Sequence, residues 1–288
     1  MTEEVKRRHI FTGSQAGAGP TTPDHGCMNA IVNPYPSAPK SAQLWTLIQA
    51  NVAAGLNLHI EQIHGVEGRA WVEALIAPIE SMDATRIVHE AARQHKSEWL
   101  DLAVMEAAIN WASHQLPSPD LVSVNAMHGT ISHTGFPAFV RRLLDAAGMP
   151  PNRLCIEISE MMPPTDVRAS VDNIRRLRRQ GVRFAVDDIG SGWSNLTLAA
   201  AAGVEIFKVD MSLLWASGHC EQARAMLHGL KALAACCDAE IVIEGVETPA
   251  HAKTVAELGG AASQGYLYGR PVRVCTCRAS ARKNHVLR

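Results

Sequence analysis

The chain has 288 residues, of which 47% are hydrophobic, and it carries 27 basic and 28 acidic side chains. This length allows one large α/β domain or two ordinary ones, and the hydrophobic content suffices for a sizeable core. Because the charges nearly balance, no strong field would attract a nucleic-acid polymer or a membrane surface, so we expect neither partner. Any anionic ligand must be held locally.

Cysteine usage and hydropathy favour a cytoplasmic protein. The seven cysteines are an odd number without zinc-type spacing, which argues against a secreted disulfide framework. Cys275 and Cys277 could bind a metal or oxidise, but their spacing differs from that of the usual zinc knuckle, so inert thiols are expected. No apolar run reaches the roughly 18 residues that a membrane span needs, and the polar N-terminus is no secretory signal.

The N-terminal quarter predicts a leader, a helix and a hairpin. Residues 1–40 mix charges, Gly, Pro, Ser and Thr with little periodicity, which is typical of a mobile leader. Apolar residues at helical spacing predict a helix over Ser41 to Ala54. Two short apolar runs, Leu56 to Ile63 and Arg69 to Ile76, flank the turn sequence HGVEG and predict a β-hairpin.

A glutamate stands inside the second hairpin strand. Glu73 is surrounded by apolar residues, and a charged carboxylate left unpaired there would cost several kcal/mol. It therefore needs a cation or a proton, and either need makes it a candidate for a functional site. Two helical patterns follow, at Ala84 to Gln94 and Glu98 to His114.

The middle of the chain alternates strands and helices. A strand over Leu121 to Met127 contains Asn125, and a strand over Leu154 to Ser159 contains Glu157. Glu160 has the opposite parity to Glu157, so only one of the two can point squarely at a common site. The intervening and following helices are predicted at Phe136 to Ala147 and Val167 to Gln180.

The segment from Arg183 to Asp210 concentrates the candidate chemistry. A short apolar run ends at Asp187 and Asp188 before the turn sequence IGSG, an Ala-rich helical segment follows, and the next strand carries Lys208. Strand, helix, strand implies a parallel pair. An Asp-rich surface turn is the alternative interpretation, because such turns are common.

The remaining elements complete a repeated strand–helix unit. A helix over Glu221 to Cys237, a strand over Glu240 to Ile243 followed by Glu244 and Glu247, a helix over Pro249 to Leu258 and a run from Ala262 that contains Gln264 are predicted. One barrel of about eight strands over residues 41–272 would use this length, and polar residues would end its strands. Residues 273–288 form a basic tail, which we expect to be solvated rather than bound to nucleic acid.

Placed on one barrel rim, the strand-end residues form an acidic constellation. Two unit charges about 4 Å apart repel by roughly 4 kcal/mol at an effective dielectric constant near 20, so the acids need cations. Oxygen ligands suit Mg²⁺ or Mn²⁺, and two divalent ions would neutralise five acids and one lysine. Paired metals favour phosphodiester hydrolysis. The rim residues are Glu73, Asn125, Glu157, Asp187, Asp188, Lys208, Glu244 and Gln264.

Seven ordered segments carry a family resemblance. The sequences VEAL, VSVN, IEISE, VDDIGSGWSNL, IFKVD, VIEGVET and QGYLYGRP resemble the motifs of the EAL-domain family of bacterial cyclic di-GMP phosphodiesterases. The resemblance runs from about Leu56 to Val272. It implies a TIM-type (β/α)8 barrel with an antiparallel first strand, which the predicted hairpin fits independently.

The resemblance also implies roles for individual residues. Lys208 would orient or help deprotonate the attacking water, with Glu73 and Glu244 also catalytic, and cyclic di-GMP would be opened to linear pGpG. Glu160 and Glu247 resemble residues that support the loop after Asp188. Gln264 would contact water or substrate. One ion would be bound by Glu73, Asn125, Glu157 and Asp187, and a second by Asp187, Asp188 and Glu244.

Two departures from the family pattern keep alternatives open. Ala77 stands where the family usually has arginine, and the loop DDIGSGWSNL replaces DDFGTGYSSL. A member that binds cyclic di-GMP or a protein partner without hydrolysis is therefore a second hypothesis, and a purely structural acidic rim is a third. The resemblance implies a homodimer through the segment that begins at Ile189, with Trp193 as an aromatic anchor.

Overall fold

The pairing of eight strands closes them into a barrel. The structure is a computed structural model that describes residues 41–65, 68–159, 166–190 and 196–276, so the predicted leader and most of the predicted tail lie outside the described residues. The strands follow the order β2-β3-β4-β5-β6-β7-β8-β1, and β1 pairs again with β2 to complete the ring. The predicted barrel is confirmed.

The first strand is antiparallel to both of its barrel neighbours, as predicted. It pairs with β2 in a register that sets Glu61 opposite Glu73, and with β8 through Ile63 and Gln264. The strands from β2 to β8 pair in parallel. The barrel strands are β1 Asn57–His64, β2 Ala70–Ile76, β3 Leu121–Met127, β4 Leu154–Ser159, β5 Arg183–Ile189, β6 Ile206–Val209, β7 Glu240–Ile243 and β8 Ala262–Gln264.

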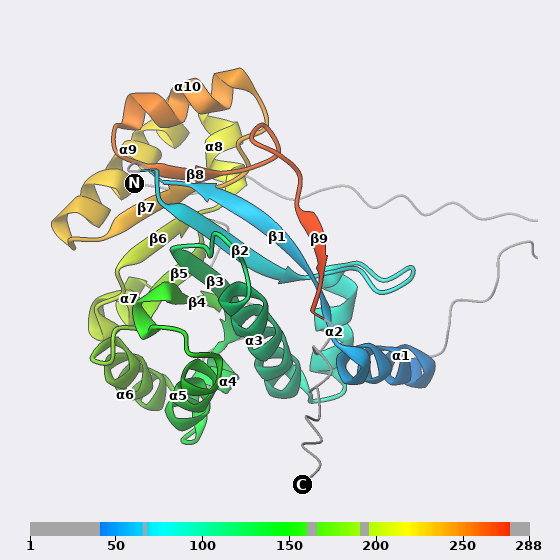
Figure 1. Cartoon of the computed structure of the whole chain (residues 1–288). Coiled ribbons are helices and arrows are strands. Elements are labelled where there is room, and N and C mark those ends of the chain that lie inside the picture. Colours follow the sequence, from blue (N-terminus) through cyan, green and yellow to red (C-terminus); the bar gives the residue numbers. More distant parts are fainter. Residues whose placement is uncertain (1–40, 66–67, 160–165, 191–195, 277–288) are drawn as a thin grey trace, which may run out of the picture. The chain divides into compact units, whose positions relative to one another are not determined.

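Helices connect the parallel strands and pack around them (Figure 1). Their ends follow the chemistry of the sequence: Gly148 ends α5 in a left-handed conformation with φ of 62°, and Pro249 opens α10 after the capping side chain of Thr248. The helices are α1 Ser41–Ala54, α2 Ala84–Arg93, α3 Ser97–Ser113, α4 His128–Ser132, α5 Phe136–Ala147, α6 Val167–Arg178, α7 Leu196–Ala202, α8 Met211–Ser217, α9 Glu221–Cys236 and α10 Pro249–Leu258.

Two apolar layers hold this arrangement. Outside the barrel, helix faces pack on the sheet, as α6 does with Val171, Ile174 and Leu177. Burying each such side chain stabilises the fold by about 1.5–3 kcal/mol. Inside the barrel, one residue from each strand forms a closed apolar layer: Ile63, Trp71, Leu121, Cys155, Ala185, Ile206, Val242 and Ala262. This layer fills the barrel below the predicted acidic rim.

The C-terminal end of the described chain differs from the prediction. Val272–Cys275 form a further strand, β9, which pairs antiparallel with β1, although the basic sequence predicts a tail from residue 273 onward. The strand is mostly exposed, so its sequence has no alternation of buried and exposed residues that would predict it. Cys275 is disulfide-bonded, so the prediction of an inert thiol there is wrong. A cytoplasmic location stays a prediction.

Among the described helices, none combines the length and the apolar character that a membrane span requires.

Candidate active site

The acidic rim is the next layer of inward-pointing side chains after the closed apolar layer. Side chains in a strand alternate between its two faces, so the residue two positions after each layer residue points into the barrel again. On β2 to β8 these positions are Glu73, Ser123, Glu157, Asp187, Lys208, Glu244 and Gln264, and on the antiparallel β1 the equivalent position is Glu61. The strands thus direct the predicted residues into one barrel mouth, at the carboxyl ends of β2 to β8.

Lys208 lies at the centre of this mouth. Its Nζ is 2.6 Å from Glu157 Oε2, 2.8 Å from Glu244 Oε1 and 3.2 Å from both Glu73 Oε2 and Asp187 Oδ1. The side chain is 1% exposed. Burial alone would lower the pKa of Lys208, but the surrounding carboxylates raise it well above its usual value. Lys208 is therefore a cation that serves as the internal counter-ion of the rim.

Glu73 is the best-satisfied carboxylate of the group. Its Oε1 accepts a hydrogen bond of 2.9 Å from Asn125 Nδ2, and its Oε2 accepts bonds of 2.8 Å from Gln264 Nε2 and 3.2 Å from Lys208 Nζ. Burial raises the pKa of Glu73, but the positive charge of Lys208 and these bonds lower it overall. Glu73 is thus held as a carboxylate.

The other carboxylates near Lys208 bind protons more tightly than usual. Burial is the largest cause in each case, because the charged form loses its hydration. The pKa of Glu157 is well above its normal value, that of Asp187 is raised, and that of Glu244 rises to about 8. Without further cations, one lysine cannot stabilise the full negative charge of this mouth.

A bulge in β5 brings two consecutive aspartates to the same side. The register with β6 shifts between Val186 and Ile189, and Asp188 has a left-handed φ of 56°, which Asp tolerates better than most residues. Without the bulge, Asp187 and Asp188 would face opposite sides of the sheet. Carboxylate oxygens of Asp187, Asp188 and Glu244 instead lie within 4.8 Å of one another.

The donor set fits hard divalent cations. Glu157 Oε1 and Gln264 Oε1 are buried and have no hydrogen-bond partner among the described residues, although buried oxygens normally have one. Together with the clustered oxygens of Asp187, Asp188 and Glu244, they are ligands of the type that Mg²⁺ and Mn²⁺ take. A metal-binding role for these residues therefore agrees with their surroundings.

The supporting residues predicted from the sequence have mixed outcomes. Glu160 and Trp193 lie outside the described residues. Glu247 is exposed, and its backbone N–H donates to His251 Nδ1 at 3.3 Å. The structure does not bring Glu247 to Lys208, so its role in loop support stays a prediction. Ala77 is 1% exposed, and its N–H donates to the carbonyl of Asn57 at 3.1 Å.

Glu61 is a rim residue that the sequence analysis missed. It lies opposite Glu73. Burial raises the pKa of Glu61, the neighbouring Gln264 side chain lowers it, and the charge of Glu73 adds to the rise. The parity of β1 could have revealed it, because Glu61 is two positions from the buried Ile63 on a predicted hairpin strand.

The chain is similar in sequence to several known bacterial proteins. An uncharacterized protein of Mycobacterium tuberculosis is 29% identical over 177 residues, which is 60% of this chain and 28% of the relative. Two relatives come from Pseudomonas aeruginosa. The bifunctional diguanylate cyclase/cyclic di-GMP phosphodiesterase MucR is 30% identical over 151 residues, 52% of this chain and 22% of MucR. The cyclic di-GMP phosphodiesterase RocR is 28% identical over 158 residues, 55% of this chain and 40% of RocR.

Solved structures share the fold. The PaMucR phosphodiesterase, in a c-di-GMP complex, has a TM-score of 0.71 at 24% identity and covers 80% of this chain and 97% of that chain. The EAL domain of Xanthomonas citri FimX has a TM-score of 0.73 at 14% identity, with 81% and 94% covered. Klebsiella pneumoniae BlrP1, in a manganese/cy-diGMP complex, has a TM-score of 0.68 at 24% identity, with 77% and 58% covered.

A family model provides the assignment. The aligned parts are 22–40% of the length of the curated relatives named above, so they compare one domain and not whole proteins. The model of the EAL domain matches residues 60–271, which is most of the chain and contains the whole acidic rim. The chain therefore belongs to the EAL domain family.

Proposed function

We propose that the protein is a divalent-metal-dependent phosphodiesterase that opens cyclic di-GMP to linear pGpG and so lowers the level of this second messenger. The observation that carries the proposal is the buried convergence of four carboxylates on Lys208 at distances of 2.6–3.2 Å. Catalytic groups at the carboxyl ends of strands are typical of such barrels. The names of MucR and RocR give the same reaction for those relatives.

Two Mg²⁺ or Mn²⁺ ions would be held by the rim. When bound, such a pair supplies Lewis-acid stabilisation of the attacking and leaving oxygens and makes hydroxide available near neutral pH. Glu73, Asn125, Glu157 and Asp187 would hold one ion, and Asp187, Asp188 and Glu244 the other. The orphan oxygen of Glu157 and the cluster around Asp187 support this division.

The chain's own residues would orient the reactants. Lys208 remains protonated because of its carboxylate neighbours, so it would donate a hydrogen bond to the attacking water and fix its position. Glu73 and Glu244 would help to position and deprotonate that water, and Gln264 would contact the water or substrate. The water oxygen bonds to phosphorus, the bond from phosphorus to the 3′ oxygen breaks, and that oxygen leaves with a proton as a hydroxyl group.

Product analysis tests the proposal. Purified protein with Mn²⁺ should convert cyclic di-GMP to pGpG, separated by chromatography. Asp187→Asn should lower kcat by about 100-fold or more, because it weakens ligation for both ions. Glu257→Gln, an exposed change on α10, is the matched control and should leave the rate unchanged. Absence of pGpG from the unaltered protein across Mg²⁺ and Mn²⁺ concentrations would exclude the hydrolase.

Binding without turnover is the second candidate. One observation favours it: Ala77, where the family resemblance implies an arginine, is buried and offers no charged donor. Loss of a hydrogen bond to a charged group weakens binding by about 10- to 150-fold. Calorimetry with Ca²⁺ as the divalent ion would reveal saturable binding of cyclic di-GMP, and chromatography of the same samples with Mn²⁺ would show whether turnover accompanies it.

The proposal includes a homodimer through the segment that begins at Ile189. The support is the family resemblance, since residues 191–195 lie outside the described part of the chain. Sedimentation velocity at about 10 μM and above should give a dimer, in the range where ordinary protein interfaces are occupied. A monomer with full activity would contradict this part of the proposal.

A further inference from the structure

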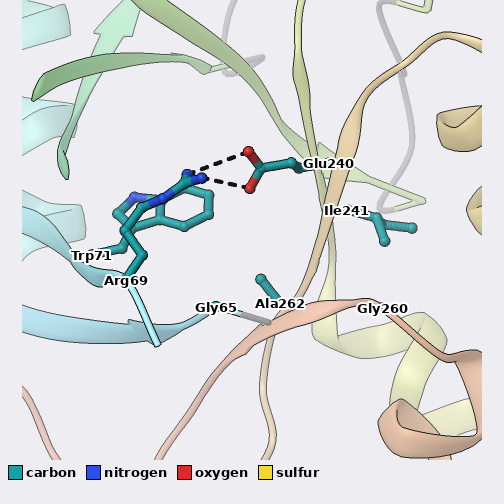
Figure 2. Close-up of a pocket in the computed structure, with 7 residues that line it drawn as sticks. All are labelled: Gly65, Arg69, Trp71, Glu240, Ile241, Gly260 and Ala262. Carbon is teal, nitrogen blue, oxygen red and sulfur yellow. Dashed lines mark hydrogen bonds and ion pairs between the residues drawn. The ribbon is translucent and has the colours of Figure 1, made fainter. Parts of the chain in front are cut away.

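A cavity opens at the end of the barrel opposite the acidic rim. Its volume is about 250 Å³. Figure 2 shows seven residues that line it. The lining comes from the amino-terminal ends of β2, β7 and β8 and from the turn after β1, and it includes Trp71 and Ala262 of the closed apolar layer. The lining residues are Gly65, Arg69, Trp71, Glu240, Ile241, Gly260 and Ala262. No residue proposed for metal binding or catalysis takes part in it.

Two guanidinium groups share one carboxylate there. Arg69 Nη1 lies 3.3 Å from Glu240 Oε1 and 3.5 Å from Oε2, and Figure 2 shows the two side chains directed toward each other. Arg183 Nη2 donates to the same Glu240 Oε1 at 2.7 Å. Burial raises the pKa of Glu240, but Arg183 and Arg69 lower it overall, so Glu240 is ionised at neutral pH. The three side chains therefore carry a net charge of about +1.

A third cation borders the cavity. Lys231 Nζ, from α9, donates to the carbonyl of Gly260 at 2.7 Å. Two other acids near this end have partners of their own: Asp120 Oδ2 accepts from the N–H of Ala70, and Glu205 is paired with Arg178 at 2.7 Å. The net charge around the cavity is therefore positive, which favours binding of an anion.

The arginines keep donors available. Each guanidinium has five N–H donors in a planar fork, and the bonds to Glu240 engage one nitrogen of each. The side chains of Arg69 and Arg183 are 31% and 21% exposed, so solvent reaches both. Gly65 and Gly260 line the cavity without side chains. Arginine forks match the oxygen geometry of phosphates.

We propose that this cavity binds a small oxyanion of the phosphate class, either inorganic phosphate or the phosphate group of a small monoester, at Arg69 and beside the Glu240 carboxylate that Arg183 also contacts. Glu240 occupies part of the donor set and limits the affinity, so it acts as a built-in competitor of the ligand. The volume suits such a small ligand rather than a dinucleotide. The site does not depend on the proposed phosphodiesterase activity.

Calorimetry with inorganic phosphate on the metal-free full-length chain tests the site. Without metal, the acidic rim repels phosphate and does not contribute. Arg69→Gln should weaken binding about tenfold or more, because it removes charge-assisted donors from the cavity wall, and Arg183→Gln should weaken it less, because it removes only a positive charge next to Glu240. Glu240→Gln should strengthen it severalfold, because the competing charge is removed. A parallel titration with glycerol phosphate distinguishes the free anion from a monoester.

Two surface variants control for overall charge. Arg141→Gln removes an exposed arginine paired with Asp145 at 2.8 Å, and Glu257→Gln removes an exposed carboxylate on α10. Both should leave phosphate binding unchanged. Absence of saturable binding to the unaltered chain below about 10 mM would overturn the proposal, as would equal effects of Arg69→Gln and Arg141→Gln. If an arginine variant fails to fold, Glu240→Gln against Glu257→Gln still decides the outcome.

Discussion

Lys208 sets the electrostatic state of the rim at the scale of a single residue. Replacing it with methionine keeps the length of the side chain and removes the cation, so the four carboxylates around it repel one another. Each pair about 4 Å apart then costs roughly 4 kcal/mol if both are ionised. We expect Lys208→Met to lower the melting temperature in metal-free buffer, and to lower it more at pH 8 than at pH 6. Scanning fluorimetry at both pH values measures this.

Added Mn²⁺ should restore more stability to Lys208→Met than it adds to the unaltered protein, because the ion replaces the missing charge. Lys253→Met is the matched control, since Lys253 is exposed and lies 3.9 Å from Glu257. If Lys208→Met and Lys253→Met have the same melting temperature at pH 8, the charge of Lys208 does not stabilise the carboxylates around it.

Glu61 adds an acid to the rim that no proposed ligand set contains. Across about 8 Å of water, a unit charge and a divalent ion attract by about 1 kcal/mol, which corresponds to about fivefold in affinity. Glu61→Gln is therefore expected to weaken Ca²⁺ binding about fivefold in calorimetry while the number of sites stays the same. Glu257→Gln serves as the distant control. Unchanged affinity would show that Glu61 is neutral or screened at the working pH.

Asp101 on α3 couples stability to pH away from the rim. It accepts hydrogen bonds from Met127 N at 2.8 Å and from Thr130 Oγ1 at 2.5 Å, but burial still raises its pKa to about 6. In the unfolded chain the pKa is about 3.9. The folded state therefore holds this proton more tightly, and stability is lost as pH rises from about 4 to about 6, by at most about 3 kcal/mol.

Asp101→Asn should remove this loss, since an amide oxygen can accept both bonds and does not ionise. The melting temperature of the variant relative to the unaltered protein is expected to increase from pH 4 to pH 7 and then to level off. A difference that is constant across this range would mean that Asp101 keeps an ordinary pKa.

At the scale of elements, the position of β8 depends on one glycine. Gly265 has φ of 152°, and a Cβ atom there would lie 2.3 Å from Val246 N and 2.5 Å from Val246 O. The N–H of Val246 also donates to the carbonyl of Gln264 at 3.0 Å. Gly265→Ala should push β8 from this backbone, move Gln264 from Glu73 and lower the melting temperature by about 4 °C or more.

The matched control is a glycine at which alanine should not lower the melting temperature. Gly229 lies inside α9, and a Cβ atom there meets nothing within 4 Å. Alanine is the better helix former by about 0.5–1 kcal/mol, so Gly229→Ala should leave the melting temperature unchanged or raise it. Equal losses from both substitutions would mean that the contact with Val246 does not matter.

Most elements could be predicted from the sequence because period and end signals agree. Apolar runs bounded by turn residues give the strands, and Gly148 and Pro249 mark helix ends where the structure has them. The antiparallel hairpin follows from two runs close in sequence. The rim residues follow from polar groups inside or after apolar strands, since burial makes such groups conspicuous.

Other features depend on contacts between residues far apart in the chain, which the pattern of apolar and polar residues does not predict. The short helices α4 and α8 follow strands directly and have too few residues for a period. Strand β9 is mostly exposed and is defined by its pairing with β1. The hydrogen bonds that Glu73 accepts from Asn125 and Gln264 depend on strand order, and the bulge at Asp188 depends on a local backbone conformation.

At the scale of the whole molecule, β9 extends the sheet beyond the closed ring. Truncation after Pro271 removes it and uncovers one side of Leu58 and Ile60, so we expect lower stability. The ring itself should stay closed, because Ile63 still pairs with Gln264. Circular dichroism should show retained secondary structure and a lower, still cooperative, melting transition.

Truncation after Thr276 keeps β9 and is the control for that experiment. Reducing agent in both samples removes any contribution from the disulfide of Cys275. A non-cooperative transition after the longer truncation would show that β9 is needed to close the barrel.

The antiparallel first strand also affects biosynthesis. Its partner β8 is about two hundred residues further along, and ribosomes add about 5–20 residues per second. The hairpin can form early and protect one edge of β1, but the edge with Leu58 and Ile63 waits about 10–40 s for β8 and β9. Open strand edges pair readily with other chains. The nascent protein is therefore most vulnerable to aggregation along β1, and chaperones that shield this edge would improve its yield.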